Sequence, residues 1–275
     1  FCEGTADSMR KSFVFVLALV VLLGVLVFLY FSSWNSMEIG HVKRIIDGDT
    51  IELNNSEKVR LLGINTPERN ERYFEEAKGR LEEIVLNRTV MMEGDERDKY
   101  GRLLRYIYVD GSMINLKMVE EGLATVYLLG NIRHKEKLLG AEKRAISSGK
   151  GMWSNSSKNK CVSCMILSDF VWDSEGNDCH NPEGEYFVLE NKCLFECNLT
   201  GWVARDSGTA RFVFPRVLLK QGEEIFVHSG AGKNSPEELY WDRGGSCPAV
   251  WNNNGDTLYL LDSGERLVLR RSYGF

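Results

Sequence analysis

Three strand-like runs follow one another within residues 45–68, and the bends between them constrain the fold more than any other sequence feature. The first two runs meet at the Asp-Gly-Asp of residues 47–49, where glycine permits a tight bend. The third run is mostly apolar, carries Arg60 and leads to Asn-Thr-Pro-Glu at 65–68, whose proline restricts the backbone beside Glu68. Carboxylates on such a bend suit a hard cation, and an arginine in a strand suits a phosphate.

A second arginine, Arg102, lies downstream in the Asp-Lys-Tyr-Gly-Arg turn of residues 98–102. A cation, two arginines and one spare carboxylate are the parts needed to hydrolyse a phosphodiester, because fixed positive groups stabilise the charge that develops on the phosphate. The formal net charge is −5, so the chain has no overall basic field that would attract nucleic acid. Binding of a nucleic-acid substrate must therefore depend on a local group of positive side chains.

The motifs at 47–50, 60–68 and 98–102 resemble those of the thermonuclease family, with the same order and spacing. Weaker matches follow at 119–124 and 151–153. The resemblance implies an OB-fold β-barrel with helices over residues 41–153. It also implies cleavage of DNA and RNA with little sequence preference, leaving a 3′-phosphate. The alternative is an inactive barrel that binds nucleic acid or acts in adhesion at the cell surface.

The resemblance assigns a role to each matching residue. The expected catalytic residues are Arg60, Glu68 and Arg102, the expected calcium ligands are Asp49, Asn65 and Thr66, and the expected substrate contacts are Lys99 and Tyr100. Thr66 would contribute its backbone carbonyl, and Glu68 would orient or deprotonate the attacking water. Asn65 stands where the family has a third acidic ligand, and its amide brings no charge, so we expect weaker calcium binding.

Hydrophobic periodicity predicts the elements of the first domain. Strands are expected at 41–46, 49–54, 58–64, 89–94 and 103–109, and helices at 71–87, 112–121 and 134–148. Short strands with interposed helices are compatible with a small closed barrel.

A polar linker at 154–160 precedes a region of short strands separated by turn residues, which predicts a β-sandwich over residues 161–275. Strands are expected at 186–190, 199–204, 210–214, 224–228, 257–261 and 266–271. The segments at 185–191, 198–202, 214–215 and 251–257 resemble a lamin-tail domain, which is immunoglobulin-like. The resemblance implies a binding or structural module whose partner the sequence does not identify.

The cysteines cluster in the second domain, whereas the predicted barrel has none. They are Cys161, Cys164, Cys179, Cys193, Cys197 and Cys247, with a seventh, Cys2, near the start. An even number of cysteines in a domain that is expected to lie outside the cytoplasm favours disulfides, because that compartment is oxidising. Zinc held by the paired cysteines is the alternative.

An apolar run at 13–31 predicts a transmembrane anchor over residues 12–34. Arg10 and Lys11 precede it, so residues 1–11 are expected to be cytoplasmic and both domains extracytoplasmic. A cleaved signal peptide, which would release a secreted protein, is the alternative. The sequence begins with Phe, and Met9 is a candidate start.

Overall fold

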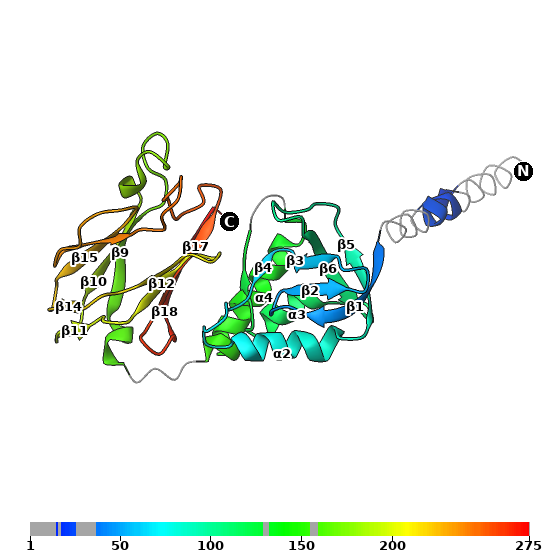
Figure 1. Ribbon diagram of the computed structural model, residues 1–275, viewed down its shortest axis with the longest axis horizontal. Helices are drawn as coiled ribbons and strands as arrows, with labels where there is room; N and C mark the ends of the chain where they lie inside the picture. Colours follow the sequence, from blue (N-terminus) through cyan, green and yellow to red (C-terminus); the bar gives the residue numbers. More distant parts are fainter. Residues whose placement is uncertain (1–14, 16–17, 26–36, 129–131, 155–158, 275) are drawn as a thin grey trace, which may run out of the picture.

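The computed structural model describes residues 15, 18–25, 37–128, 132–154 and 159–274. Figure 1 shows two domains beside one another, which we call the barrel domain (38–153) and the sandwich domain (159–274). Residues 155–158 of the predicted linker lie outside the described residues.

The barrel domain is built on a curved sheet that closes on itself. Its strands are β1 (Glu38–Ile45), β2 (Thr50–Leu53), β3 (Lys58–Leu61), β5 (Thr89–Glu93), β6 (Leu103–Val109) and β7 (Ser112–Met113). They follow the order β3-β2-β1-β5-β6-β7, and β3 also pairs in parallel with β6, which closes the barrel. A short pair, β4 (Ile64–Asn65) with β8 (Thr125–Val126), lies outside this sheet. The OB-fold prediction is therefore confirmed, with a strand in each expected segment.

Three helices cover the barrel: α2 (Phe74–Val85), α3 (Ile114–Glu120) and α4 (Lys135–Ser147). Helix α2 buries an apolar stripe that repeats at helical spacing, which is why this segment packs as a helix. It begins three residues later than predicted because Tyr73 has a left-handed backbone, with φ of 68°. The loop between Pro67 and α2 is therefore not helical, a point that matters for the site.

The sandwich domain contains two four-stranded sheets, β16-β15-β10-β9 and β13-β12-β17-β18, and a short pair β11-β14. The strands are β9 (Met165–Val171), β10 (Tyr186–Asn191), β11 (Cys197–Asn198), β12 (Val203–Arg205), β13 (Arg211–Val213), β14 (Leu218–Leu219), β15 (Glu224–Ser229), β16 (Glu238–Trp241), β17 (Asp256–Leu261) and β18 (Leu267–Tyr273). Between the sheets, Trp202, Phe187 and Phe214 are almost fully buried. The sandwich prediction is confirmed, although sequence reasoning missed β9 and β16. The strand predicted at 199–204 is in fact a turn that leads into β12.

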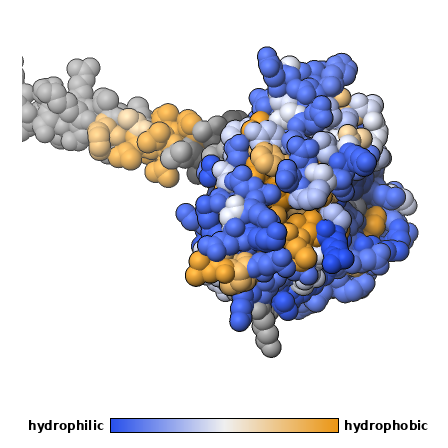
Figure 2. Space-filling view, turned by 90° about the vertical axis from the view of Figure 1, so that its left-hand side faces the viewer, coloured by the Kyte–Doolittle hydropathy of each residue, from blue (hydrophilic) through white to orange (hydrophobic). Residues whose placement is uncertain are grey.

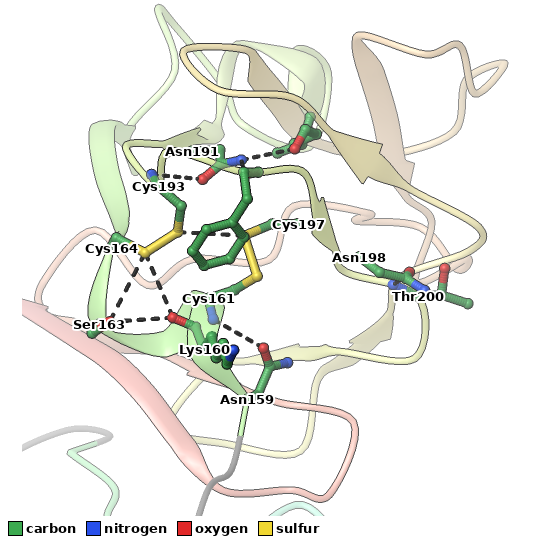
Figure 3. Close-up of a disulfide and its surroundings, with 12 residues drawn as sticks. Asn159, Lys160, Cys161, Ser163, Cys164, Asn191, Cys193, Cys197, Asn198 and Thr200 are labelled. Atoms are coloured by element: carbon green, nitrogen blue, oxygen red, sulfur yellow. Dashed lines mark hydrogen bonds between the residues drawn. A yellow bond between two sulfur atoms is a disulfide. The ribbon is translucent and has the colours of Figure 1, made fainter.

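Three disulfides cross-link the sandwich domain. They join Cys161 to Cys197, Cys164 to Cys193, and Cys179 to Cys247. Figure 3 shows the first two close together, where they tie the 3₁₀ turn η2 (Lys160–Ser163) to the segment between β10 and β11. The domain thus begins with a cross-linked segment.

The structure does not support the zinc alternative. Among the described residues, the sulfurs of Cys161, Cys193 and Cys197 are the one group of His, Cys, Asp or Glu ligand atoms gathered within 4.8 Å. Each of these sulfurs is already in a disulfide and so offers no thiolate to a metal. The group arises because the two disulfides stack, with the sulfurs of Cys193 and Cys197 3.4 Å apart.

Most of the predicted membrane anchor at 12–34 lies outside the described residues. The described part, Phe15 and residues 18–25, is helical and exposed, and Figure 2 shows it as apolar. Within the described ranges, no helix is both long enough and apolar enough to span a membrane.

The disulfides should dominate the stability of the sandwich domain. Each closes a loop in the unfolded chain and is expected to contribute roughly 2–4 kcal/mol. Reductant should therefore lower the melting temperature of the sandwich domain, measured by calorimetry on the full chain, while a chelator should have no effect. The Cys179→Ser/Cys247→Ser double variant, which opens the longest of the loops, should melt earlier even without reductant. A chelator-sensitive, reductant-tolerant transition would contradict this prediction.

Candidate active site

The acidic bend between β1 and β2 holds two carboxylates in place. The backbone N–H of Asp49 donates to Asp47 Oδ1 at 3.1 Å, which tightens the bend. A Cβ on Gly48 would lie 2.7 Å from Thr66 Oγ1 and 2.9 Å from the Cβ of Ala77. Glycine is therefore required because the bend packs directly against the segment that follows β4.

The carboxylate of Asp49 is buried and fully engaged. Its Oδ1 accepts a hydrogen bond from the Thr50 hydroxyl at 3.1 Å. Its Oδ2 accepts from the Thr66 backbone N–H at 3.0 Å and from the Thr66 hydroxyl at 3.1 Å. Arg60 forms an ion pair with the same Oδ2 at 3.0 Å. The expected ligands Asp49 and Thr66 thus lie together, although they are well separated along the chain.

The guanidinium of Arg60 is held in one orientation by four partners. Its Nη1 donates to the carbonyls of Leu61 (2.7 Å) and Ile64 (2.8 Å). Its Nη2 donates to Asn65 Oδ1 at 2.9 Å and faces Asp49 Oδ2. Because five N–H donors in a planar fork are largely satisfied in this way, the group is preorganised for a further anion.

Arg102 reaches the same centre from the turn before β6. Its Nε donates to Asp98 Oδ2 at 2.7 Å, and its Nη1 lies 3.5 Å from the Thr50 hydroxyl. Because Thr50 also donates to Asp49, the hydroxyl links Arg102 to the buried carboxylate. The structure therefore brings both predicted arginines to one end of the barrel.

The predicted substrate contacts lie beside Arg102. Tyr100 is 73% exposed and does not pack into the barrel. The Lys99 ammonium lies 5.2 Å from the centre of the Tyr100 ring, and the Arg102 guanidinium lies 5.7 Å from it. An exposed ring flanked by cations is suited to stacking on a base while the cations contact phosphate.

Two further acids at the site have perturbed pKa values. Burial, with the charge of Asp49, raises the pKa of Asp47 to about 6. Partial desolvation, with the charges of Asp49 and Glu71, raises the pKa of Glu68. Among the described residues, no hydrogen bond or ion pair engages the Glu68 carboxylate. It is therefore free to contact a water molecule or a substrate.

The oxygen donors fit a hard cation. Asp47 and Asp49 repel each other, and a cation would relieve that repulsion. The amide of Asn65 and the carbonyl of Thr66 are the further donors expected beside them. However, Nη2 of Arg60 already bridges Asp49 Oδ2 and Asn65 Oδ1, so this arginine supplies one positive charge in the same place.

The sandwich domain contacts the predicted metal ligand Asn65. The Nδ2 of Asn65 donates to the carbonyl of Gly208 at 2.7 Å, in the turn between β12 and β13. From the same domain, Arg205 and Arg211 form ion pairs with Glu71 at 3.9 and 3.7 Å. Sequence reasoning missed all four of these partners because they belong to no nuclease motif. Only the folded chain brings residues so distant in sequence together.

Comparison with known proteins agrees with this architecture. The family profile described as "Staphylococcal nuclease homologue" matches residues 58–155, and "Lamin Tail Domain" matches residues 164–275. The thermonuclease of Staphylococcus hyicus is 35% identical over 126 residues, which are 42% of this chain and 75% of that protein. The "SPbeta prophage-derived endonuclease YokF" of Bacillus subtilis (strain 168) is 38% identical over 125 residues, 40% of this chain and 42% of that protein. "Endonuclease YncB" of the same organism is 37% identical over 139 residues, 43% of this chain and 66% of that protein.

A closed barrel with an acidic bend and two arginines at one end defines an OB-fold domain of the nuclease type, here followed by an immunoglobulin-like sandwich. The chain belongs to the thermonuclease family, the staphylococcal nuclease homologues, and its second domain is a lamin-tail domain. Each of these three relatives matches less than half of this chain.

A buried acid pair lies under the turn that carries Gly208. Asp256 accepts hydrogen bonds from the backbone and hydroxyl of Ser207 at 3.0 and 2.5 Å. Asp206 accepts from the Ala210 N–H at 2.8 Å. Burial, together with the charge of Asp256, raises the pKa of Asp206 to about 7. The turn that contacts the site is thus sensitive to pH.

Asp206→Asn should stabilise the protein above pH 7. The folded protein keeps a proton on Asp206 up to about pH 7, whereas the unfolded chain loses it near the ordinary value of 3.8. The stability that the raised pKa of Asp206 contributes is therefore fully present below pH 3.8 and is lost as the pH rises through about 7. Asparagine keeps the acceptor for Ala210 and cannot ionise, so the melting temperature at pH 8 should exceed wild type and the gain should vanish near pH 4. Asp95→Asn, at an exposed position, is the matched control. An equal effect at both pH values would refute the prediction.

Proposed function

We propose that this chain is a membrane-anchored, extracytoplasmic, calcium-dependent nuclease that hydrolyses phosphodiester bonds of DNA and RNA with little sequence preference. The observation that carries the proposal is the convergence of Arg60 and Arg102 on the buried Asp49, with the Glu68 carboxylate left unengaged beside them. The endonuclease and thermonuclease relatives support the hydrolytic class.

The two arginines would hold the scissile phosphate. A phosphorane carries more negative charge than the ground state, and guanidiniums already fixed by other partners stabilise it without reorganising. Arg60 is fixed by backbone carbonyls and Arg102 by Asp98. Arg102 keeps donors for phosphate oxygens, since its one short side-chain contact is the bond from Nε to Asp98.

Glu68 would orient the attacking water and accept its proton. Its raised pKa brings the carboxylate closer to the operating pH, which favours proton transfer. Calcium bound by Asp49, Asn65 and the Thr66 carbonyl would supply positive charge to a phosphate oxygen. The exposed Tyr100 would stack on a base of any identity, which accounts for the low sequence preference.

The extracytoplasmic location is supported by the cysteine chemistry. Three disulfides form and persist in an oxidising compartment. The apolar sequence at 12–34 would anchor the chain there. A membrane-impermeant lysine label applied to intact cells tests the placement, and domains that react only after lysis would contradict it.

Glu68→Gln should lower turnover about 10²–10³-fold on both DNA and RNA, as expected when one group that acts in the charge-developing step is removed. Arg60→Lys should have a similar effect, since lysine cannot reproduce the two-sided fork. The measurement is kcat on single-stranded substrates in the presence of calcium, with and without a chelator.

Glu76→Gln is the matched control because Glu76 is an exposed acid on the same segment, in the first turn of α2. It should retain wild-type kcat. Wild-type turnover in a folded Glu68→Gln variant would refute the catalytic assignment. A wild-type protein that binds nucleic acid without cleaving it would instead support an inactive binding barrel.

Asn65→Asp should tighten calcium binding and lower the calcium concentration needed for activity, because a carboxylate adds charge to the donor set. The same change removes the Nδ2 donor to Gly208, so Asn65→Ala, which loses both functions, is the control. Titration calorimetry on the two variants separates the effects. Unchanged or weaker affinity in Asn65→Asp would mean that residue 65 does not face the cation.

A further inference from the structure

The sandwich domain holds the loop that carries Glu68. Two of its turns contact residues 65–73 of the barrel domain: the turn between β12 and β13, and the turn between β17 and β18. From the second turn, Glu265 Oε2 accepts the backbone N–H of Arg72 at 3.0 Å, and the Gly264 carbonyl accepts from Arg72 Nη1 at 3.2 Å. From the first, the Gly208 carbonyl accepts from Asn65, as described above.

Glu71 connects this contact to the catalytic carboxylate. Its Oε2 accepts the backbone N–H of Glu68 at 2.8 Å. Its other contacts are the ion pairs with Arg205 and Arg211, and Arg211 also pairs with Glu265. Only 16% of the Glu71 side chain is exposed, so this group is fixed rather than solvated. The chain of contacts therefore runs from the sandwich through Glu71 to the backbone of Glu68.

Local hydrogen bonds hold the loop within its own domain, such as the Glu71 N–H donated to the Glu68 carbonyl at 2.9 Å, but part of its backbone is unfavourable. Asn70 and Tyr73 both have left-handed backbones, with φ of 74° and 68°. Asparagine tolerates this conformation, whereas for tyrosine it is costly and persists only where surrounding contacts impose it. No side chain caps the start of α2 either. The sandwich adds further restraints on the loop, through its contacts with Arg72 and Glu71.

Domain association does not itself require these contacts. Elsewhere in the interface, the Tyr259 hydroxyl donates to Glu142 at 2.7 Å, and Arg270 pairs with the same buried carboxylate. Trp153 stacks on Tyr259 with ring centres 5.6 Å apart. Residues of both sets, including Glu71 and Tyr259, line a cavity of about 30 Å³, but the hydrogen bonds of Tyr259 and Arg270 go to Glu142 and not to the loop.

We propose that Glu71, Arg205 and Arg211 are positioning residues for Glu68, through which the sandwich domain sets the geometry of the barrel's active site. The proposal rests on the nuclease function proposed above. It makes the sandwich part of the catalytic unit, in addition to any partner that it binds elsewhere. Figure 2 shows apolar patches on its outer side. The exposed large apolar side chains of the domain include Leu194, Phe195 and Leu218.

The test uses the full chain with the Arg205→Gln/Arg211→Gln double variant. Misplacing a catalytic group by about 1 Å costs up to roughly 10²-fold, so we expect kcat to fall about 10- to 100-fold with KM nearly unchanged. Glu71→Gln, which keeps the acceptor for Glu68 but loses both ion pairs, should have a similar effect. Adding it to the double variant should cause little further loss, because all three residues act through one chain of contacts. With Arg205→Gln kept, Arg211→Lys in place of Arg211→Gln should restore part of the kcat that the double variant loses, because lysine keeps the positive charge.

Hydrogen exchange provides a readout that does not depend on activity. The backbone amides of residues 65–73 should exchange faster in the double variant, while those of α3 stay protected. Tyr259→Phe removes an interdomain hydrogen bond away from the loop and should change neither the loop's exchange nor kcat. Unchanged exchange in the loop, or faster exchange with wild-type kcat, would overturn the proposal. If the wild-type protein cleaved no nucleic acid, the proposed function would fail. The exchange rates of residues 65–73 in the double variant would still show whether the sandwich holds the loop.

Discussion

The buried carboxylate of Asp49 is the interaction on which the rest of the site depends. It joins the start of β2 to Thr66, which follows β3 and β4 in the sequence, and it pairs with the positive charge of Arg60. A buried charge is costly unless it is paired and hydrogen-bonded, and here the contacts that satisfy Asp49 also fix Arg60, expected to hold phosphate, and Thr66, an expected calcium ligand. Stability and preorganisation of the site therefore come from the same bonds.

A second buried acid, Glu142, performs a comparable task between the domains. It has no exposed surface, accepts the backbone N–H of Val126 at 2.8 Å, and is satisfied from the sandwich side by Tyr259 and Arg270. Val126 lies in β8, which pairs with the strand that contains Asn65. Separating the domains would leave this buried charge without its partners in the sandwich, so the contacts of Glu142 favour docking of the two domains.

Secondary structure could be predicted from the sequence wherever residues close together in the chain determine it. The pattern at 49–54, the glycine bend at 47–49 and the apolar stripe of α2 each predicted the element that formed, whereas the strand predicted at 58–64 ends at Leu61 because a turn follows it. Prediction failed where tertiary contacts decide. Helix α2 starts late because Tyr73 is held in a left-handed conformation, and β16 forms by parallel pairing with β15, which no local pattern signals.

The periodicity of the sequence by itself predicted most of the strands and helices and the β-sandwich, and the resemblance of its motifs to the thermonuclease family implied the barrel and the residues that meet at one end of it. The sequence left the cysteine pairing open, and it gave no sign that Gly208, Arg205 and Arg211 would lie against Asn65 and Glu71. Only the tertiary structure decided those points. The contacts are made across two domains, between residues such as Asn65 and Gly208 that are 143 positions apart, and their formation depends on how two separately buried cores dock.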